Sequence, residues 1–517
     1  MTLEPNRLDD REKRYWDFVE NRQLSNLRLT LSSVFQELVN SIIEKNHPGV
    51  EQELSLYLAQ LYFDELCGVN IINRFVSNPF NKSKVKLNLP REIYTRLAAK
   101  IPTWEIGRDS LSFFLWNCVK SVKSFLRIVH LFFMLTTQFS LSSPKSKESV
   151  IFIVNHTKEF QIQKSREEFK ETHNYAQWRK VQGYKIVDVT FLREIDFFRL
   201  LIKKNSYIEN LLIFVKVISL FPKKLFASGV KGRDLFIASE QIVLYLIVRM
   251  SRLSSFCFEV GFTESSGSKR PVWTYELERL GIPISMIMFS NSAVLSVNGE
   301  DGCPAEFMRY SWKSYEIVSN WQYMVLRKYA IFGLESKFRI NGVPWYQDIP
   351  YKFLESENCA IAVFDMEPHL GYFGFTSLND WGLSSISYAL DFLDSIIEIC
   401  AKYKVLMIHK QKRVLTKDRV HPMYARKLES LAKHAQYLRI PASVAPSKLI
   451  QQVSGVISYI PTTTELLARQ MNIPSIFFDP SGKINRLDPA LVESIILSSQ
   501  EELEKWIIEV KSSSNQA

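Results

Sequence analysis

The feature that most constrains the fold is the stretch from Tyr403 to Pro480, in which short apolar runs alternate with helical segments. Residues 404–410 (KVLMIHK) and 455–460 (GVISYI) are rich in apolar, β-branched and aromatic residues. Such runs are typical of strands buried on both faces of a parallel sheet. Because ligands bind outside the carboxyl ends of parallel strands, the residues after each run are candidate site residues.

A threonine-rich turn follows the second run. Pro461 ends the strand because proline cannot donate to a strand ladder. Thr462, Thr463 and Thr464 then open a predicted helix that has Glu465 in its first turn. The backbone N–H groups of a helix start lack intrahelical partners, and together with hydroxyl groups they can bind phosphate. We therefore expect a threonine side-chain cap and a phosphate site at this position.

A basic cluster follows the first run. Lys410, Lys412 and Arg413 would project from the end of another strand of the same sheet, where their charge compensates a phosphate. The two features read as belonging to successive βα units, and together they favour a site for a diphosphate or a nucleotide monophosphate. The alternative is an ordinary capped helix beside a solvated basic loop.

Three motifs in this order resemble a known family: VFDMEPH (363–369), KVLMIHKQKR (404–413) and VISYIPTTTELLARQMNIPSIFFDP (456–480). The family is that of bacterial surface-polysaccharide biosynthesis proteins named for a Pro-Phe-Thr-Ser (PFTS) motif. The similarity extends upstream through residues 267–292 and 340–348, so it covers the last half of the chain. The name-giving motif differs, because Thr462 stands in place of Phe and Thr464 in place of Ser.

The resemblance implies an α/β fold of GT-B type, with two Rossmann-like domains facing a cleft and a helical N-terminal region. It also implies a glycosyltransferase that takes a sugar from a nucleotide-sugar donor to a glycan or lipid-linked glycan acceptor. Lys410, Lys412 and Arg413 would neutralise the leaving phosphate, while residues 462–464 bind its oxygens. The alternative function is a non-catalytic partner in polysaccharide assembly or export that retains the same sheet.

Two acids are candidate catalytic residues. Glu264 lies in a turn just after a predicted strand, where the base that deprotonates the acceptor would stand in such a transferase; otherwise it is a surface acid beside Lys269 and Arg270. Asp365 ends an apolar strand and would hold a hydroxyl of the acceptor or a base, or else cap the adjoining loop.

No cofactor or metal is expected. The chain lacks the glycine-rich motifs of P-loop enzymes and dinucleotide oxidoreductases, the HExxH motif, the GxSxG motif and a DxD motif. Basic, metal-free phosphate sites of this sort resemble those of enzymes that use donors of acidic sugars linked to cytidine monophosphate (CMP). A CMP-linked donor is therefore favoured over a nucleoside-diphosphate sugar.

The length of 517 residues and the hydrophobic content of 46% provide for two or three domains with full cores. We predict a helical N-terminal region at 1–146 and a first Rossmann-like, acceptor-side domain at 147–350, with a helical insertion at about 190–255. A second Rossmann-like domain, which binds the nucleotide donor, would span 351–517.

Residues 111–141 form a long, aromatic-rich segment in the helical region. Lys120, Lys123 and Arg127 interrupt it, so its uncharged part is shorter than the roughly 20 residues that cross a bilayer. A helix of this kind can lie in a membrane interface or pack against the body of the protein. Peripheral membrane contact is therefore one expectation for this segment.

The formal net charge is +11 and the isoelectric point about 9.1, which suits phosphates, anionic glycans or anionic membranes. The cations are spread along the whole chain, so we expect no nucleic-acid partner. The six cysteines include no CxxC pair, and the first residues are charged and unlike a secretory signal. These features predict a cytoplasmic protein that is either free or peripheral on the inner membrane.

Overall fold

The structure is a computed structural model. It describes residues 23–45, 49–66, 84–87, 105–108, 110–137, 150–154, 179–180, 183–184, 188–192, 194–204, 206–227, 235–251, 253, 258–263, 269–288, 305–343, 359–368, 385–411, 420–442, 444–459, 462–486 and 494–514.

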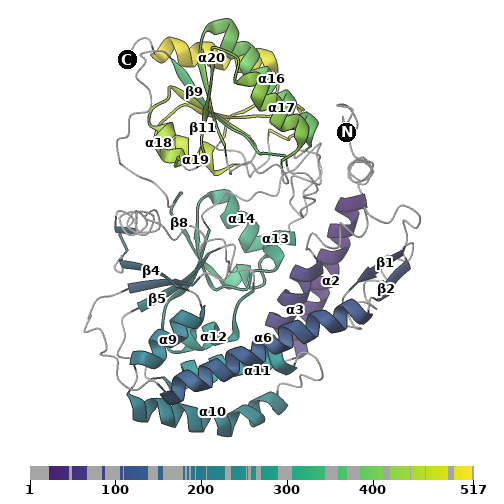
Figure 1. Ribbon diagram of the computed structural model, residues 1–517, viewed down its shortest axis with the longest axis vertical. Helices are drawn as coiled ribbons and strands as arrows, with labels where there is room; N and C mark the ends of the chain where they lie inside the picture. The colour runs from purple at the N-terminus through teal and green to yellow at the C-terminus, as the bar shows by residue number, and fades with distance from the viewer. Residues whose placement is uncertain are drawn as a thin grey trace.

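Two parallel six-stranded sheets form the framework, one in the lower and one in the upper half of Figure 1. The lower sheet has the order β4-β3-β5-β6-β7-β8. Its strands are β3 (Val150–Val154), β4 (Asp188–Leu192), β5 (Phe258–Thr263), β6 (Ile284–Ile287), β7 (Ser314–Ile317) and β8 (Lys337–Ile340). All five pairings in this sheet are parallel, which is typical of a doubly wound α/β domain.

Helices surround this lower sheet. They are α9 (Glu194–Lys204), α10 (Tyr207–Ala227), α11 (Leu235–Met250), α12 (Val272–Arg279), α13 (Ala305–Met308) and α14 (Asn320–Tyr329), and a 3₁₀ turn, η3 (Gly333–Glu335), follows α14. Helices α9, α10 and α11 lie within the predicted helical insertion at 190–255, and β4 overlaps its first residues; the insertion itself stays a prediction. Strands β4 and β7 contain polar residues, so a search for continuous apolar runs in the sequence does not identify them.

The helical N-terminal region is present as expected. It contains α2 (Gln23–Lys45), α3 (Val50–Leu66) and α6 (Ser110–Thr137), with a small parallel pair of β1 (Lys84–Leu87) and β2 (Glu105–Arg108). The side chain of Gln60 on α3 donates to the carbonyl of Arg309 at 2.7 Å and accepts from the backbone N–H of Arg270 at 3.0 Å. Helix α3 is thereby fixed to the lower α/β domain.

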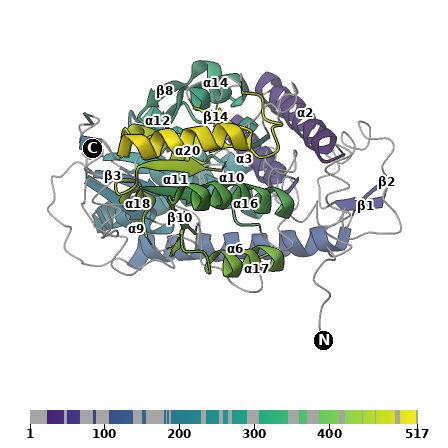
Figure 2. The ribbon, with the colours of Figure 1, turned by 90° about the horizontal axis from the view of Figure 1, so that it is seen from above.

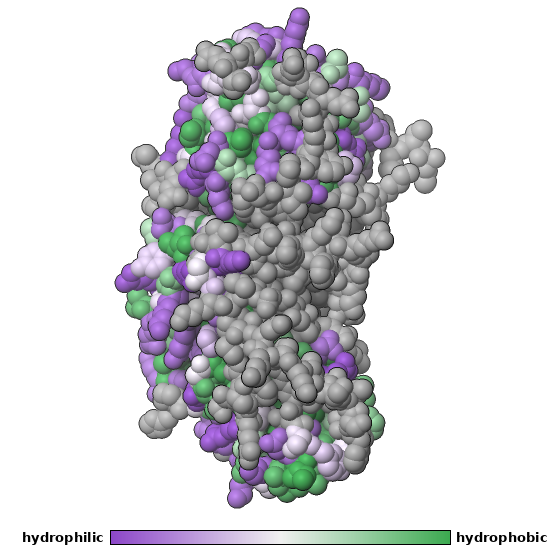
Figure 3. Space-filling view, turned by 90° about the vertical axis from the view of Figure 1, so that its left-hand side faces the viewer, coloured by the Kyte–Doolittle hydropathy of each residue, from purple (hydrophilic) through white to green (hydrophobic). Residues whose placement is uncertain are grey.

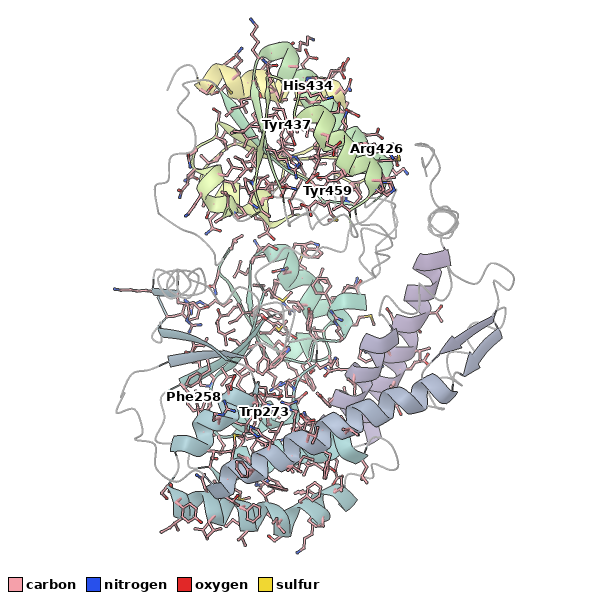
Figure 4. All side chains as sticks on the ribbon, viewed as in Figure 1. Phe258, Trp273, Arg426, His434, Tyr437 and Tyr459 are labelled. Carbon is pink, nitrogen blue, oxygen red and sulfur yellow. The ribbon has the colours of Figure 1, made fainter. Side chains whose placement is uncertain are left out.

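Helix α6 is tied to the same domain through a buried aromatic cluster. Trp273, labelled in Figure 4, stacks on Phe197 with ring centroids 5.1 Å apart, and its Nε1 donates to Glu194 at 2.7 Å. Arg127 of α6 donates to the other oxygen of Glu194 at 2.6 Å and also pairs with Glu240.

Within the described residues, no helix combines the length and apolar character needed to cross a bilayer.

The contact between α3 and α12 makes stability depend on pH. Glu53 pairs with Arg279, yet burial raises the pKa of Glu53 to about 7 against the lowering effect of Arg279 and Arg270. Because this pKa exceeds the ordinary value of 4.5, the native state binds the proton more tightly than the unfolded chain does. The stabilisation is complete below the ordinary pKa and is lost as the pH rises through about 7.

We therefore expect Glu53→Gln to remove a pH-dependent loss of about 3 kcal/mol in the free energy of unfolding. The measurement is urea unfolding of both proteins at about pH 5 and about pH 8. Wild type should lose stability relative to the variant as the pH rises. A difference between the two proteins that does not change with pH would contradict the assignment.

The upper sheet has the order β11-β10-β9-β12-β13-β14. Its strands are β9 (Ala360–Phe364), β10 (Leu406–Lys410), β11 (Tyr437–Ile440), β12 (Gly455–Ser458), β13 (Ser475–Phe478) and β14 (Ile496–Leu497). Numbered within this domain the order is 3-2-1-4-5-6, which is the Rossmann order. The expected α/β fold with two Rossmann-like sheets is confirmed, whereas the domain boundaries drawn from the sequence stay predictions.

Helices cover both faces of the upper sheet. They are α16 (Ile386–Tyr403), α17 (Pro422–Leu431), α18 (Pro446–Ile450), α19 (Thr463–Gln470) and α20 (Gln500–Ser514). Figure 2 shows α16 and α20 side by side, and the two helices are in contact. Gly455 of β12 lies under α20, because a Cβ atom at this position would stand 2.9 Å from the ring of Trp506.

Alternate residues of the upper strands enter different cores. Ile361, Val363 and Met407 belong to the large core that also contains residues of α16 and α17. Ala362 and Ile408 belong to a smaller core with residues of α18 and α19. The face on which each polar residue at a strand end lies therefore follows from its position in this alternation.

The connection from the lower to the upper sheet is anchored on the upper domain. Gly342 has φ of 71°, a left-handed conformation that favours glycine. The next residue, Val343, is buried in the smaller upper core, and its backbone N–H donates to Oε1 of Gln470 at 3.0 Å. Gln470 is the last residue of α19, so this helix holds the connection in place.

Candidate functional site

The strand order identifies a switch point in the upper sheet. From β9, the chain first builds outward on one side through β10 and β11, and then on the other side through β12, β13 and β14. The crevice outside the carboxyl ends of β9 and β12 is where ligands bind in sheets of this kind. Tyr459, directly after β12, lies at the end of the upper domain nearest the lower domain in Figure 4.

Hydroxyl groups line the end of β12. Ser458, the last residue of the strand, is fully buried, and its Oγ lies 2.9 Å from Oγ1 of Thr464. Oγ1 of Thr464 in turn lies 3.0 Å from Oγ1 of Thr462. We call these three residues the hydroxyl cluster; it joins the strand end to the start of α19.

The expected threonine side-chain cap is wrong in detail. Thr462 occupies the N-cap position of α19 with extended backbone angles, φ −119° and ψ 151°, but its side chain makes no capping hydrogen bond. Its hydroxyl contacts Thr464 instead. Thr463 is the first residue of the helix, and the buried carboxylate of Glu465 accepts from Ser494 at 3.1 Å. The helix start that the sequence predicted is therefore present with a different hydrogen-bond pattern.

Lys410 lies at the end of β10 and is only 5% exposed. Its Nζ donates to the carbonyl of Gln411 at 2.9 Å and to that of Ala442, in the segment after β11, at 3.5 Å. Burial lowers the pKa of Lys410, and the carboxylate of Glu367 acts in the opposite direction. A buried ammonium group held by two carbonyls, beside the switch point, is a pre-positioned positive charge.

The two predicted halves of the phosphate site are not on neighbouring strands. The interpretation as successive βα units is wrong, because β11 lies between β10 and β12 in the chain, and β9 lies between them in the sheet. Strands are spaced by about 4.8 Å, so the ends of β10 and β12 stand roughly 10 Å apart. Lys410 and Ser458 occupy positions of the same face in the alternation, with Phe364 between them.

Asp365 lies on the other face and is enclosed. Its Oδ1 is 3.0 Å from Nε2 of His409, and both side chains are fully buried. The hydroxyl of Tyr424 on α17 donates to its Oδ2, and Nδ1 of His409 lies 2.8 Å from the hydroxyl of Tyr437. Both ring nitrogens of His409 form favourable contacts when Nε2 carries the proton that faces Asp365 and Nδ1 accepts a hydrogen bond from the hydroxyl of Tyr437.

We call Asp365, His409, Tyr424 and Tyr437 the aspartate–histidine network. Burial and the nearby Asp365 raise the pKa of Tyr424, so its hydroxyl keeps its proton. The network joins β9, β10, β11 and α17 beneath the switch point. These contacts hold the side chain of Asp365 in place, and its contact with an acceptor hydroxyl or a base stays a prediction.

Lys412, Arg413 and Glu264 lie outside the described residues. Glu264 is the next residue in the chain after β5, which ends at Thr263. Their roles stay predictions. Among the described residues, no group of three or more His, Cys, Asp or Glu side chains is arranged to hold a metal ion.

Sequence reasoning missed His409 and the partners of Asp479. His409 and Lys410 are adjacent, so strand alternation sends one side chain to each face, and that signal was available in the apolar run. Asp479 after β13 is fully buried and accepts from the hydroxyl of Tyr388 at 3.0 Å and from the backbone N–H of Ile484 at 3.0 Å. No local pattern pairs Tyr388 with Asp479, because that contact depends on how α16 packs.

Comparisons with known proteins bear on this site. A comparison with curated proteins found no match. A solved structure titled "Crystal Structure Analysis of the Glycotransferase of kitacinnamycin" aligns with a TM-score of 0.34 and 10% identity, over 71% of this chain and 92% of that chain. Residues 230–507, more than half of the chain and including both described sides of the switch point, match the model of a family described as "Polysaccharide biosynthesis PFTS motif protein". The chain belongs to the polysaccharide biosynthesis PFTS motif family.

Proposed function

We propose that this protein is a glycosyltransferase that moves a sugar from a nucleotide-sugar donor onto a bacterial surface polysaccharide or its lipid-linked precursor. The single observation that carries the proposal is the Rossmann order of the upper sheet, with the hydroxyl cluster at its switch point. Membership in a polysaccharide biosynthesis family supports a role in building the glycan.

The donor phosphate would occupy the carboxyl edge of the upper sheet. Thr462 and Thr464 would exchange their mutual hydrogen bond for bonds to phosphate oxygens, and the start of α19 would add the favourable end of the helix dipole. Lys410, assisted by Lys412 and Arg413, would stabilise the negative charge that develops on the leaving phosphate. Because β9 lies between β10 and β12 in the sheet, Lys410 would contact the phosphate from the side of β9 opposite the hydroxyl cluster.

The acceptor would be activated from the lower domain. Glu264, which follows β5 in the chain, is our candidate base for an acceptor hydroxyl. We assign Asp365 to hold β9 and β10 in register beneath the donor, through His409. The donor that we propose is an acidic sugar linked to CMP. Its single phosphate could bind the hydroxyl cluster, whereas a nucleoside-diphosphate sugar would require a place for a second phosphate.

The test is a panel of nucleotides added to the full chain, with thermal unfolding as the first measurement. A nucleotide at 100 times its Kd stabilises the native state by about 2.7 kcal/mol, which raises the unfolding temperature by several degrees. We expect CMP to give the largest shift. A shift with uridine diphosphate but none with CMP would contradict the proposed CMP-linked donor. No shift with any nucleotide would contradict the proposal that the protein is a glycosyltransferase.

Transfer of sugar to an acceptor is the second measurement. Release of free nucleotide from the sugar donor that gives the largest thermal shift should require an acceptor glycan. Tight nucleotide binding without any release would instead indicate the non-catalytic assembly or export partner.

A further inference from the structure

Helix α6 carries an exposed apolar stripe. Val122, Leu126, Val129 and Phe133 recur at spacings of four, three and four residues, and each side chain is between 47% and 61% exposed. The opposite face of the helix is buried, with Leu131 and Leu135 in the large core. The helix therefore packs against the protein and at the same time presents large apolar side chains to its surroundings.

Helix α10 carries a second stripe of the same kind. Ile208, Leu212, Val215 and Ile218 are between 50% and 69% exposed, and Ile213 and Val217 on the opposite face are buried. The two helices lie at the end of the molecule opposite the upper domain in Figure 1. Figure 3 shows hydrophobic surface gathered at this same lower end.

The two stripes border each other. Phe132 of α6 and Phe214 of α10 make an edge-to-face contact with ring centroids 5.5 Å apart. On a helix with 3.6 residues per turn, each of these two rings lies on the flank of its own stripe. The α6 stripe and the α10 stripe therefore form one apolar surface across the helix pair, which we call the helix-pair surface.

The charges on the two helices are predominantly positive. The sequences of α6 and α10 contain six lysines and arginines, Lys120, Lys123, Arg127, Lys216, Lys223 and Lys224, and a single acid, Glu209. Arg127 forms ion pairs with Glu194 and Glu240 and points its charge toward them. Glu209 accepts a hydrogen bond from the backbone N–H of Ser206 at 2.8 Å. Lys216 and Lys223 are exposed beside the α10 stripe.

We propose that the helix-pair surface binds an anionic lipid bilayer, with α6 and α10 lying in the plane of the interface. Apolar side chains on one face with lysines at its margin are the combination that inserts into the boundary between headgroups and acyl chains. Each lysine near an anionic surface adds about fivefold to the affinity.

A second copy of this chain fits the same surface less well. A twofold contact would bring Lys216 and Lys223 of one copy against the same surface of the other copy, where like charges repel. The charge complementarity therefore favours the anionic membrane.

The test is flotation of the full chain with vesicles of phosphatidylcholine alone, or with about one-third phosphatidylglycerol. We expect binding to the anionic vesicles, and at least about tenfold weaker binding for the double variant Ile208→Glu with Val215→Glu. Lys216→Glu with Lys223→Glu should also lose at least about tenfold, and only toward the anionic vesicles.

Matched controls carry the same charge changes elsewhere. Leu334→Glu with Ile495→Glu replaces two apolar side chains that are 82% and 57% exposed, and Lys433→Glu with Lys505→Glu reverses two exposed lysines of the upper domain. Both controls should bind as wild type does. Lack of binding by wild type, or equal losses in controls and variants, would overturn the proposal.

Light scattering on the same proteins tests the competing occupant. A dimer that dissociates in the Ile208→Glu and Val215→Glu variant, without vesicle binding by wild type, would assign the surface to a second copy. Vesicle binding needs no nucleotide, so its failure and the failure of the nucleotide panel are separate results.

Discussion

Asp365→Ala is expected to lower the free energy of unfolding by about 3–5 kcal/mol. The carboxylate is buried at the end of β9, and its two oxygens contact His409 and Tyr424. Apart from this contact, neither Oδ1 of Asp365 nor Nε2 of His409 has a hydrogen-bond partner among the residues that the structure describes. Removal of the carboxylate therefore leaves buried polar groups without compensation.

Urea unfolding of the full chain measures the effect, with Asp391→Ala on the exposed side of α16 as the matched control. The control should change stability by less than about 0.5 kcal/mol. Asp365→Asn keeps the size of the side chain and should cost less than Asp365→Ala. Equal effects of Asp365→Ala and Asp391→Ala would show that the aspartate–histidine network does not stabilise the domain.

The same variants separate a positioning role from a catalytic one. If Asp365→Asn retains the fold and the nucleotide affinity but abolishes transfer, the side chain contacts the reacting groups. If transfer falls only in proportion to the folded fraction, Asp365 acts through the strand ends that it holds.

Lys410→Met is expected to lower the rate of sugar transfer by about a hundredfold or more, because the variant removes a charge that stabilises the leaving phosphate. Methionine keeps most of the apolar stem that packs at the end of β10. The carbonyls of Gln411 and Ala442 lose their donor, so a modest loss of stability accompanies the change.

Transfer assays at saturating donor, together with nucleotide thermal shifts, check this expectation, and Lys433→Met on the exposed surface is the control. Since burial lowers the pKa of Lys410, nucleotide affinity should decline as the pH rises toward that pKa in wild type. The variant should lack this decline. A stable Lys410→Met protein with unaltered affinity, pH dependence and rate would remove Lys410 from the site.

The strands of the upper sheet could be predicted because burial on both faces imposes a continuous apolar run. Residues 360–364 and 406–408 show this pattern directly. The edge strand β8 has mostly exposed residues and β7 begins with Ser314, so the same criterion is weak there. Burial differs between central and edge strands, and the sequence signal differs with it.

The sequence could not predict equally well which strand-end residues lie close together in the site. Local patterns identify which residues follow a strand, and Lys410 and Thr462 were found in that way. The order of strands depends on contacts between distant segments, so the position of β9 between β10 and β12 had no local signal. For the same reason the partners of Asp365 had no local signal, because His409 lies on the neighbouring strand β10 and Tyr424 depends on the packing of α17 against the sheet.

The segment around residues 111–141 allowed a buried helix or an interfacial one. In the structure α6 has both properties on different faces, because Leu131 packs inward while Leu126 is 60% exposed. Periodicity alone could not separate the two, since apolar residues occupy both faces of this helix.

Helix α19 has the hydroxyl cluster at its first turn and Gln470 at its last residue. Gln470 holds Val343, the described residue where the chain has just left the lower sheet. A helix of eight residues is about 12 Å long and moves as one rigid element, so a displacement at its first turn is transmitted to its last residue. A small tilt of α19 toward an arriving phosphate would therefore displace Gln470 and, with it, Val343, so that donor binding would be mechanically coupled to the point where the chain leaves the lower sheet.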